Sequence, residues 1–500
     1  MNQANGNSSA NVLEHLASEC LIKLRDPASY PRAEISRLAE LAASPDPETA
    51  KQAATAIFAS VVEPLADSFE PSAVAAYNRV FSQLIQHSRE SDEGRAFDRQ
   101  LRSFNLLTED DLFSRAERLR RGSTFAGPVS GSEMKRVVLL SRVTLGADVA
   151  ITSVIIERMK RRFPNAEIVL VGGRKVKELF GGDSRISFKE VGYQRAGRLT
   201  ERLSAWVEVM EATRSLTQGL GREEYLIVDP DSRLTQLGLL PIGRDLHKKT
   251  SRSTGVAAYE CESDYLFFPS REYGASTSQS LARLTCSWLN AVFGGDETTL
   301  PRVTLSRADV QTCGALAGSL RVRGRPIVAI NFGVGENPAK RLGEEFEEEL
   351  VGRLLDDGAA VILDRGAGED EARRADSVIR HIRASQRSVV EIEEGRLSQA
   401  PGGDSPVADL LVWNGRIGLL AALIGESDLY IGYDSAGQHI AAALGVPCID
   451  VMTGFSSPRM LDRWRPTGSS ETRVIVGRDS ALEETMSHSR EMLGSVRNQF

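Results

Sequence analysis

The segment YIGYDSAGQHIAAALGVP places Asp434, Ser435 and His439 between an apolar run, typical of a buried strand, and an alanine-rich stretch, typical of a helix. Asp434 can cap this helix, while the small residues Ala436 and Gly437 leave its first amide groups open to an anion. Ser435 and, about one turn later, His439 lie where they can also reach that anion. The pattern predicts a phosphate-binding helix start, and a capped helix with a packed histidine is the simpler alternative.

A second polar group follows a predicted strand in SRVTLGADVAITS. Gly146 lets the chain turn sharply, and Asp148 then lies near the start of the next helix. Its carboxylate can serve there as a helix cap, since Asp is among the preferred residues at that position. If it faces a substrate, it can instead act as a general base toward an acceptor hydroxyl.

A glycine-containing turn in INFGVGENPAKRLG is a third candidate. Gly333 and Gly335 permit close approach of the backbone to a ligand, and Lys340 or Arg341 can neutralise a phosphate on the other side of the loop. A glycine loop with surface charges explains the same residues structurally.

The turn in LDRGAGEDEARRAD is the fourth candidate, because Gly366, Gly368 and Glu369 follow a strand and open a helix. Glu369 can hold a ribose or a base edge there. The structural alternative is a first-turn carboxylate that the helix dipole favours.

All four segments need a strand that leads into a helix, and from residue 135 onward the sequence alternates in that way. Strands are predicted in RVVLLSRV, EIVLVGG, ISFKEV, YLIVDPD, YLFFPS, PIVAINFG, AAVILDRG, VVEIEE, LYIGYD and PCIDVM. Such α/β series imply parallel sheets that bind ligands beyond the carboxyl ends of their strands. We expect two Rossmann-like domains with a cleft between them, and one large doubly wound sheet is the alternative.

Residues from about 10 to 120 predict helices only. Thr108 and Asp111 form a capping-box pattern, RAERLRRG is interpreted as a solvated helix face rather than a lipid or partner contact, and GSTFAGPVSGSEM as a linker. The predicted domains are a helical domain with its linker at 1–130, a Rossmann-like domain at 131–320 and a second one at 321–500.

Length and composition fit a multidomain globular protein, with 500 residues, 41% of them hydrophobic and 26% charged. The net charge of -7 gives no reason to expect a nucleic-acid partner. The 5 cysteines are odd in number and without CxxC spacing, which predicts reduced thiols in the cytoplasm and no zinc site. We find no leader sequence and no uninterrupted apolar run of about 18 residues, so we expect at most peripheral membrane contact.

Four segments together resemble the ADP-heptose:lipopolysaccharide heptosyltransferases of glycosyltransferase family 9. They are LGADVAITSVIIERMKRRFPNAEIVLVGG, INFGVGENPAKRLGEEF, ILDRGAGEDEARRA and LLAALIGESDLYIGYDSAGQHIAAALGVPCIDVMTG. The resemblance covers roughly residues 135 to 480, so it leaves out the helical N-terminal part. Its most specific piece is the Asp-Ser-x-x-x-His run followed by AAALGVP.

The resemblance implies an inverting GT-B glycosyltransferase that needs neither a metal nor a cofactor. The donor is a nucleotide-sugar, heptose-like and ADP-linked, and the acceptor is lipopolysaccharide or another cell-envelope glycan at the inner membrane face. Asp148 matches the catalytic base. The positions that match donor-binding residues of the family are Lys340, Gly366, Glu369, Asp434, Ser435, Ala436 and His439.

Three readings of the function remain open from the sequence. A sugar transferase is the first, and a nucleotide-sugar epimerase on the same scaffold is the second. The third is a non-catalytic nucleotide-sugar or partner-binding protein that uses its helical domain as an interaction surface. Gly-Ala-Asp in place of the family's Gly-Asp, and KRLG in place of its Lys-x-Trp-Pro, are departures near the predicted site.

Overall fold

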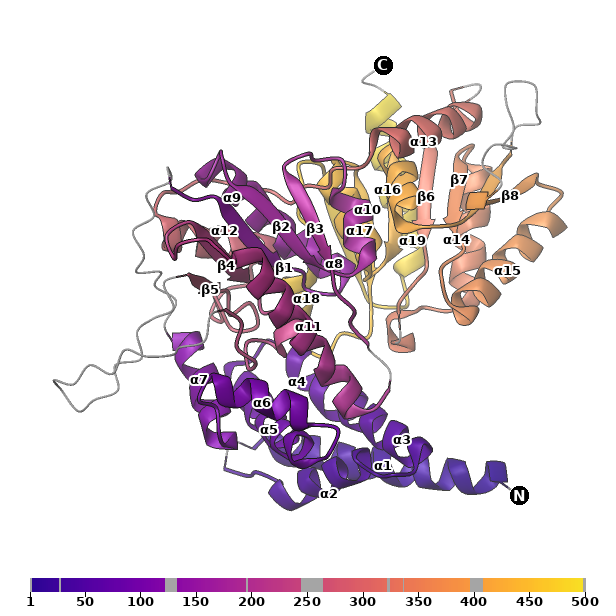
Figure 1. Cartoon of the computed structure of the whole chain (residues 1–500). Helices are drawn as coiled ribbons and strands as arrows, with labels where there is room; N and C mark the ends of the chain where they lie inside the picture. The colour runs from indigo at the N-terminus through magenta and orange to yellow at the C-terminus, as the bar shows by residue number, and fades with distance from the viewer. Residues whose placement is uncertain are drawn as a thin grey trace.

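The computed structural model describes residues 2–26, 28–121, 133–194, 197–243, 264–321, 324–335, 337–395 and 408–497. Two parallel sheets lie beside each other, and a layer of helices from the N-terminal part packs under the first sheet (Figure 1). The five-stranded sheet has the order β3-β2-β1-β4-β5 and the seven-stranded sheet the order β12-β11-β10-β6-β7-β9-β8. Two separate sheets rule out the alternative of one large sheet.

The first sheet is built from short apolar strands that are buried on both faces, as expected for a parallel sheet. Val138 in its centre is fully buried and pairs with Val169 on one side and Ile227 on the other. Its elements are β1 (Arg136–Leu140), α8 (Leu145–Ala147), η2 (Asp148–Thr152), α9 (Ser153–Arg162), β2 (Glu167–Gly172), α10 (Arg174–Phe180), β3 (Ile186–Glu190), α11 (Leu199–Thr217), β4 (Tyr225–Asp229), η3 (Arg233–Thr235), β5 (Tyr265–Phe267) and α12 (Leu281–Phe293).

The second sheet follows the same alternation, with β10 and β6 paired at its centre. Two of its strands, β9 and β12, were not predicted from the sequence. Its elements are α13 (Arg307–Leu320), β6 (Ile327–Asn331), η4 (Pro338–Lys340), α14 (Glu344–Asp356), β7 (Ala360–Asp364), α15 (Glu369–Ala384), β8 (Val389–Glu393), β9 (Leu410–Asn414), α16 (Ile417–Gly425), β10 (Leu429–Tyr433), α17 (Ala436–Leu444), β11 (Cys448–Met452), α18 (Pro458–Trp464), β12 (Thr472–Val476) and α19 (Ala481–Arg497).

The N-terminal part is helical, as predicted. The predicted capping box is confirmed, since Asp111 exchanges hydrogen bonds with Thr108, and Asp46 caps α3 by accepting from the Thr49 amide at 3.0 Å. Its elements are α1 (Asn2–Leu24), α2 (Arg32–Ala42), α3 (Pro47–Ile57), η1 (Phe58–Val62), α4 (Glu63–Asp67), α5 (Pro71–Glu90), α6 (Arg95–Ser103) and α7 (Glu109–Arg121). Most of the predicted linker, residues 122–132, lies outside the described residues.

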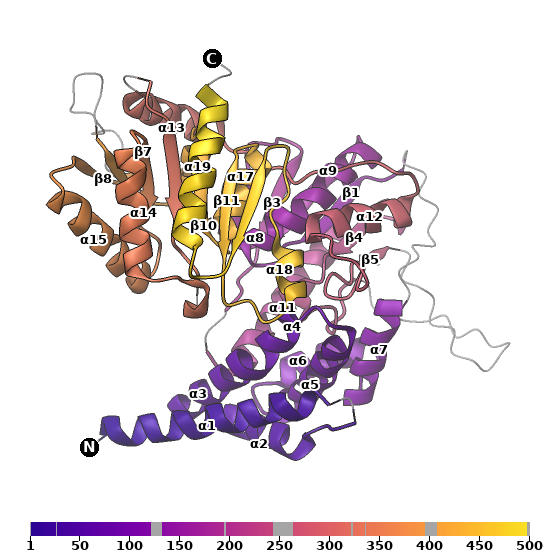
Figure 2. The same ribbon diagram turned by 180° about the vertical axis from the view of Figure 1, so that it is seen from behind.

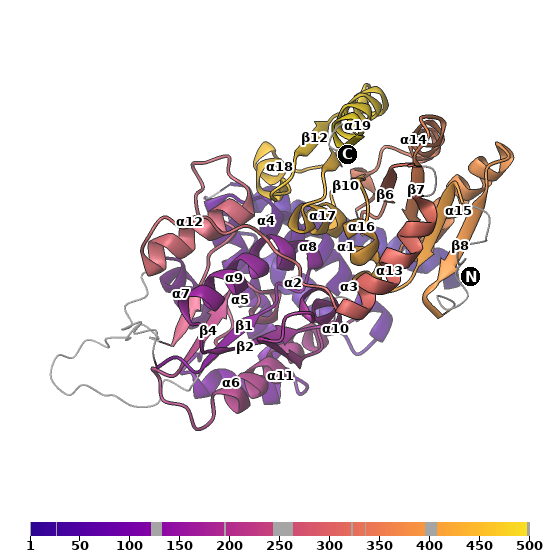
Figure 3. The same ribbon diagram turned by 90° about the horizontal axis from the view of Figure 1, so that it is seen from above.

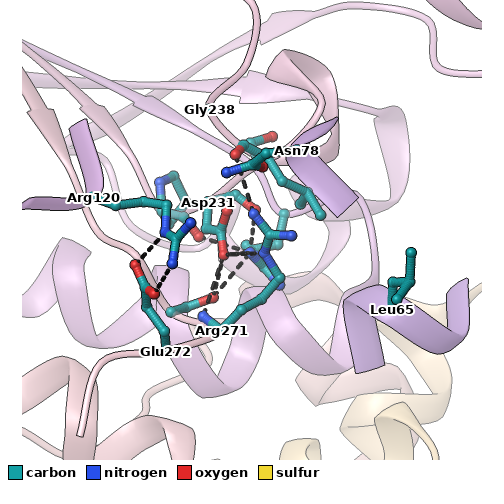
Figure 4. A network of polar contacts seen from close by, with 12 residues as sticks. Leu65, Asn78, Arg120, Asp231, Gly238, Arg271 and Glu272 are labelled. Atoms are coloured by element: carbon teal, nitrogen blue, oxygen red, sulfur yellow. Dashed lines mark hydrogen bonds and ion pairs between the residues drawn. The ribbon is translucent and has the colours of Figure 1, made fainter. Parts of the chain in front are cut away.

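The helical segment, by which we mean α1 to α7, shares a continuous apolar core with one face of the first sheet. The interpretation of RAERLRRG as a solvated face is wrong for two of its arginines. Arg115 is buried and donates to the Gly238 carbonyl at 2.6 Å, and Arg120 donates to Glu272 (Figure 4). Both bonds reach loops of the first sheet, so this helix end is a packing surface.

The two sheets are joined by a second apolar cluster, to which α9 and α12 contribute from one side and α13, α16 and α17 from the other. Seen from above, α16 and α17 lie between the sheets, where they contact α10, α8 and η2 (Figure 3). Within the described ranges, no helix is both long enough and apolar enough to cross a bilayer.

Candidate functional site

The carboxyl ends of β1 and β10 lead into helices that touch each other. A Cβ atom on Gly146 would lie 3.1 Å from the His439 ring and 3.5 Å from the Ala436 Cα atom, so only a residue without a side chain fits this approach without a shift. We call the contact of Gly146 with Ser435, Ala436 and His439 the sheet junction. Two segments singled out in the sequence therefore meet, although they are almost three hundred residues apart.

The start of α17 is capped by its own side chains. Ser435 is the N-cap and accepts from the Gly437 amide at 3.4 Å, while Gln438 accepts from the Ser435 amide at 2.9 Å. The prediction that Asp434 caps this helix is therefore wrong. The amides of Ser435 and Gly437 are also not open as predicted, because this capping box already pairs them.

Asp434 pairs instead with Lys340, one of the two cations proposed from the sequence. The Lys340 Nζ atom lies 2.6 Å from a carboxylate oxygen of Asp434, and both side chains are largely shielded from solvent. Gln438 donates to the other oxygen at 3.2 Å. Arg341 turns away and forms a two-bond ion pair with the buried Glu347. The cation beside the start of α17 is thus Lys340.

His439 is buried and packs edge-on against Trp464, with the ring centroids 5.9 Å apart. Burial lowers the pKa of the His439 imidazole to about 4; the Asp434 carboxylate opposes this decrease and the Lys340 ammonium adds to it. The ring is therefore neutral near pH 7. It can donate a hydrogen bond to an anion, but it adds no charge.

The two predicted glycine turns of the second sheet meet at a carboxylate that the sequence reasoning missed. A Cβ atom on Gly333 would lie 2.8 Å from a Glu371 oxygen, and one on Gly366, whose φ is +78°, would lie 2.4 Å from the Glu371 Cβ atom. Glu371 accepts from the amides of Ala367 and Gly368. Its place three residues after Gly368, the N-cap, was the available signal.

Glu369, the carboxylate selected from the sequence, lies exposed in the first turn of α15. Gly335, with φ of +59°, is also exposed. The contacts with Gly333 and Gly366 are made by Glu371 and not by Glu369. The role of Glu369 in binding stays a prediction.

Asp148 is fully buried in a single π-helical turn. Its carboxylate accepts three hydrogen bonds, from the Ser141 hydroxyl and the Arg142 amide at 2.7 Å and from the Thr152 hydroxyl at 2.8 Å. Burial raises the pKa of Asp148 to about 6, although these hydrogen bonds lower it. A π turn accommodates one extra residue, which matches the additional alanine in Gly-Ala-Asp. These three bonds leave one of about four acceptor positions of the carboxylate unfilled, but the side chain is fully buried.

Asp450 lies beneath the start of α17, in β11, and is fully buried. Within the described residues, neither of its carboxylate oxygens has a hydrogen-bond partner. Burial, together with the nearby Asp434 charge, raises the pKa of Asp450 well above its ordinary value, and the Lys340 charge opposes this. The Asp450 side chain is therefore held in its neutral form more readily than an exposed carboxyl.

We expect Asp450→Asn to be more stable than the wild type at pH 8, because the neutral amide removes the cost of a buried carboxyl group whose pKa is raised, about 1.4 kcal/mol for each unit of that rise. Because the folded-state pKa is raised, the stability that Asp450 contributes is present at low pH and is lost as the pH rises. The advantage of the asparagine, which does not titrate, should shrink at pH 5. Urea unfolding at both pH values measures it, with the exposed Asp92→Asn as control; a difference independent of pH would contradict the expectation.

Two hollows of the surface lie elsewhere. One is lined by residues of the stretch 214–219, at the C-terminal end of α11, and the other by Asn165 and residues around 133–135 and 221–224, which precede β2, β1 and β4. They are at or near the amino ends of the strands and include none of the predicted site residues. In the described part of the chain, no three His, Cys, Asp or Glu side chains are grouped as metal ligands.

Comparison with solved structures supports the fold. No protein-family model matches the chain, and no curated protein sequence matches it. The glycosyl transferase family 9 protein from Veillonella parvula DSM 2008 superposes with a TM-score of 0.51 at 15% identity, over 72% of this chain and 98% of its own. The chain has the GT-B fold.

Other solved structures with the GT-B fold align less closely. The E. coli ADP-heptose lps heptosyltransferase II gives a TM-score of 0.47 at 16% identity, over 73% of this chain and 99% of its own. E. coli heptosyltransferase WaaC with ADP gives 0.42 at 16% identity, over 71% and 99%. At these identities the likeness concerns the fold alone. More than a quarter of this chain lies outside the alignment with the Veillonella parvula protein.

Proposed function

We propose that this protein is an inverting glycosyltransferase that moves a heptose-like sugar from an ADP-linked donor to lipopolysaccharide or another cell-envelope glycan at the cytoplasmic membrane face. The observation that carries the proposal is the sheet junction with the Lys340–Asp434 pair beside it. Ligands of parallel sheets bind beyond the carboxyl ends of the strands. In this chain, a lysine and the N-terminus of a helix lie together at that place, and both are groups that suit a phosphate.

The donor diphosphate lies, in this proposal, between Lys340 and the start of α17. The Lys340 ammonium and the N–H of His439 stabilise the charge that develops on the leaving phosphate, without needing a divalent ion. The Glu371 carboxylate between the two glycine turns binds hydroxyl groups of the nucleoside. Gly333, Gly335, Gly366 and Glu369 belong to the same proposed donor site.

The transfer step is a displacement at the anomeric carbon. The acceptor oxygen attacks this carbon while its bond to the phosphate oxygen breaks, and the bonding electrons leave with the nucleoside diphosphate. The acceptor proton passes to a carboxylate, for which Asp148 stays the predicted base with its pKa of about 6. Attack from the first-sheet side, opposite the leaving group, inverts the anomeric centre.

Nucleotide binding is the most direct test of the proposal. At a concentration a hundred times Kd, ADP should stabilise the fold by about 2.7 kcal/mol, which for a chain of this size raises Tm by on the order of 2–3 °C. Differential scanning fluorimetry with ADP, UDP, GDP and adenosine measures this. Adenosine is the control, because it lacks the diphosphate that Lys340 binds.

The outcomes separate the alternatives. No shift with any nucleoside diphosphate would contradict both enzyme readings and leave a non-catalytic protein. If ADP-heptose binds, release of free ADP only when a glycan acceptor is added supports transfer. Conversion of the bound nucleotide-sugar into its epimer without an acceptor would show the epimerase instead.

A further inference from the structure

The turn between α4 and α5 brings the helical segment to the sheet junction. Phe69 in this turn is 2% exposed and belongs to the apolar cluster that joins the two sheets. Its ring packs edge-on against Trp464, with the centroids 6.0 Å apart, and Trp464 contacts His439. Phe69 has φ of +57°, a strained conformation for a bulky side chain that the surrounding contacts must maintain.

Two ion pairs connect α4 and the turn that follows it to both sheets. On the first-sheet side, Glu63 accepts two hydrogen bonds from Arg233 at 2.8 and 3.2 Å. On the second-sheet side, Arg459 in α18 donates to the Phe69 carbonyl at 3.1 Å and pairs with Glu70 at 3.3 Å. The views from the front and from behind agree that α4 lies beside α18 (Figures 1 and 2). The turn is thus held by α18 of the second sheet, through Trp464 and Arg459, while Arg233 of the first sheet holds the start of the preceding helix α4.

The helical segment also covers the carboxyl end of β4. There Asp231 forms a buried ion pair with Arg271 at 3.0 Å, and Asn78 of α5 and Arg120 of α7 lie beside this network, while Leu65 of α4 lies farther from it (Figure 4). The Arg271 guanidinium lies 4.6 Å from the centre of the Tyr77 ring of α5. Helices from outside the Rossmann-like part therefore form a wall next to the edge where a parallel sheet binds its ligands.

Asp67 is the polar side chain that this turn holds near the proposed donor site. It is half-buried, and among the described residues its carboxylate takes part in no hydrogen bond and no ion pair. Four charged groups from three parts of the chain act on it electrostatically: Glu63 of the same helix, Arg233 of the first sheet, and Lys340 with Asp434 of the second. Two residues further on, Phe69 packs against Trp464 beside His439, which places this turn next to the sheet junction. A carboxylate near several charges but without a bonded donor has room for the donors of a ligand.

We propose that Asp67 binds hydroxyl groups of the transferred sugar, so that the helical segment completes the donor site. This rests on the proposed function, in which the diphosphate lies at Lys340. The sugar is bonded directly to the second phosphate, so its hydroxyl groups extend only a few bonds from the Lys340 ammonium. Carboxylates accept hydrogen bonds from sugar hydroxyls and donate none, which suits a side chain with unfilled acceptor positions.

The test compares the affinities of the full chain for ADP and for ADP-heptose, measured by calorimetry. In the wild type we expect ADP-heptose to bind more tightly than ADP. In Asp67→Asn, the affinity for ADP should not fall, because the substitution only removes a negative charge near Lys340, while that for ADP-heptose falls about 10-fold, as expected when a hydrogen bond to a charged group is weakened. Asp92→Asn, an exposed aspartate of the same helical segment, is the matched control and should behave as the wild type.

The outcomes distinguish this inference from the proposed function. If the wild type binds neither ligand, the proposed function fails. If it binds both and Asp67→Asn keeps the wild-type ratio of the two affinities, or loses both equally, the role of Asp67 is overturned. Equal affinity of the wild type for the two ligands would overturn it as well. Should Asp67→Asn not fold, Asp67→Glu keeps the charge but moves the carboxylate by one methylene, and the same ratio decides.

Discussion

Lys340→Met is expected to bind ADP on the order of 100-fold more weakly than the wild type, the loss typical of removing one partner of a shielded charge pair. The variant lacks the cation for the diphosphate. It also leaves Asp434 without its ion-pair partner, so that a carboxylate then repels the incoming phosphate. Calorimetry with ADP measures the loss, and transfer should fall with it because Lys340 also stabilises the leaving group.

A double variant separates these two effects. Lys340→Met with Asp434→Asn removes the cation and the repelling carboxylate together, so it should recover part of the ADP affinity that Lys340→Met loses. Lys175→Met, an exposed lysine of α10, is the matched control for the substitution itself. An unchanged ADP affinity in Lys340→Met would remove the phosphate role of this lysine.

Asp148→Ala should lower the free energy of unfolding by roughly 3 kcal/mol, because three buried donors lose their acceptor at about 1 kcal/mol each. Asp148→Asn keeps an acceptor oxygen and should retain most of this stability. If Asp148 is the base, the asparagine variant loses about 10²- to 10⁴-fold in turnover while ADP affinity is unchanged. Urea unfolding and acceptor-dependent release of ADP measure the two effects separately.

The pH dependence gives an independent readout of the same residue. A base must be deprotonated to accept the acceptor proton, and the pKa of Asp148 is about 6. The wild-type turnover should therefore be constant above this pH and fall about tenfold per unit below it. Wild-type turnover in Asp148→Asn would leave Asp148 with its structural hydrogen bonds and assign the proton transfer to another group.

Much of the GT-B fold could be predicted from the sequence, because short apolar strands and amphipathic helices alternate with a clear period. The two strands that were missed differ in their signals. β12 is an edge strand with only Ile475 buried, whereas β9 has four buried apolar residues but lies close before the apolar helix α16, and so short a run cannot be told from a helix by periodicity. An edge strand needs few apolar residues, since one side of it has no neighbour.

The site was predicted less completely, because its contacts depend on which side chains turn toward each other. The order of residues 434 to 439 indicated a capped helix start, but Ser435 and Gln438 together form the cap that was assigned to Asp434. Asp434 and Ser435 are both common N-cap residues, so the sequence alone does not choose between them. In the structure, Asp434 pairs with Lys340 and Ser435 is the N-cap. Likewise, Glu369 and Glu371 share a helix start, and the steric fit against Gly366 selects Glu371.

The place of the helical segment could not be predicted at all. Its internal helices follow from local pattern, but Phe69 reads as one more core residue of a small bundle, and nothing in its neighbourhood indicates that it packs on Trp464. The helical segment and the second sheet meet only when whole folded parts of the chain pack against each other. Such contacts leave no periodic pattern in the sequence of either part.

The attachment of the α4–α5 turn to both sheets has a kinetic consequence. Any rotation that separates the sheets must part Phe69 from Trp464 and Arg459 from Glu70, while Glu63 stays bound to Arg233 on the first sheet. The helical segment would therefore move with the first sheet, and its contacts with α18 would break when the two sheets separate. The time for which a nucleotide stays bound would then depend on how often these contacts break, and weakening them at Arg459 would shorten the residence time without changing any contact with the nucleotide.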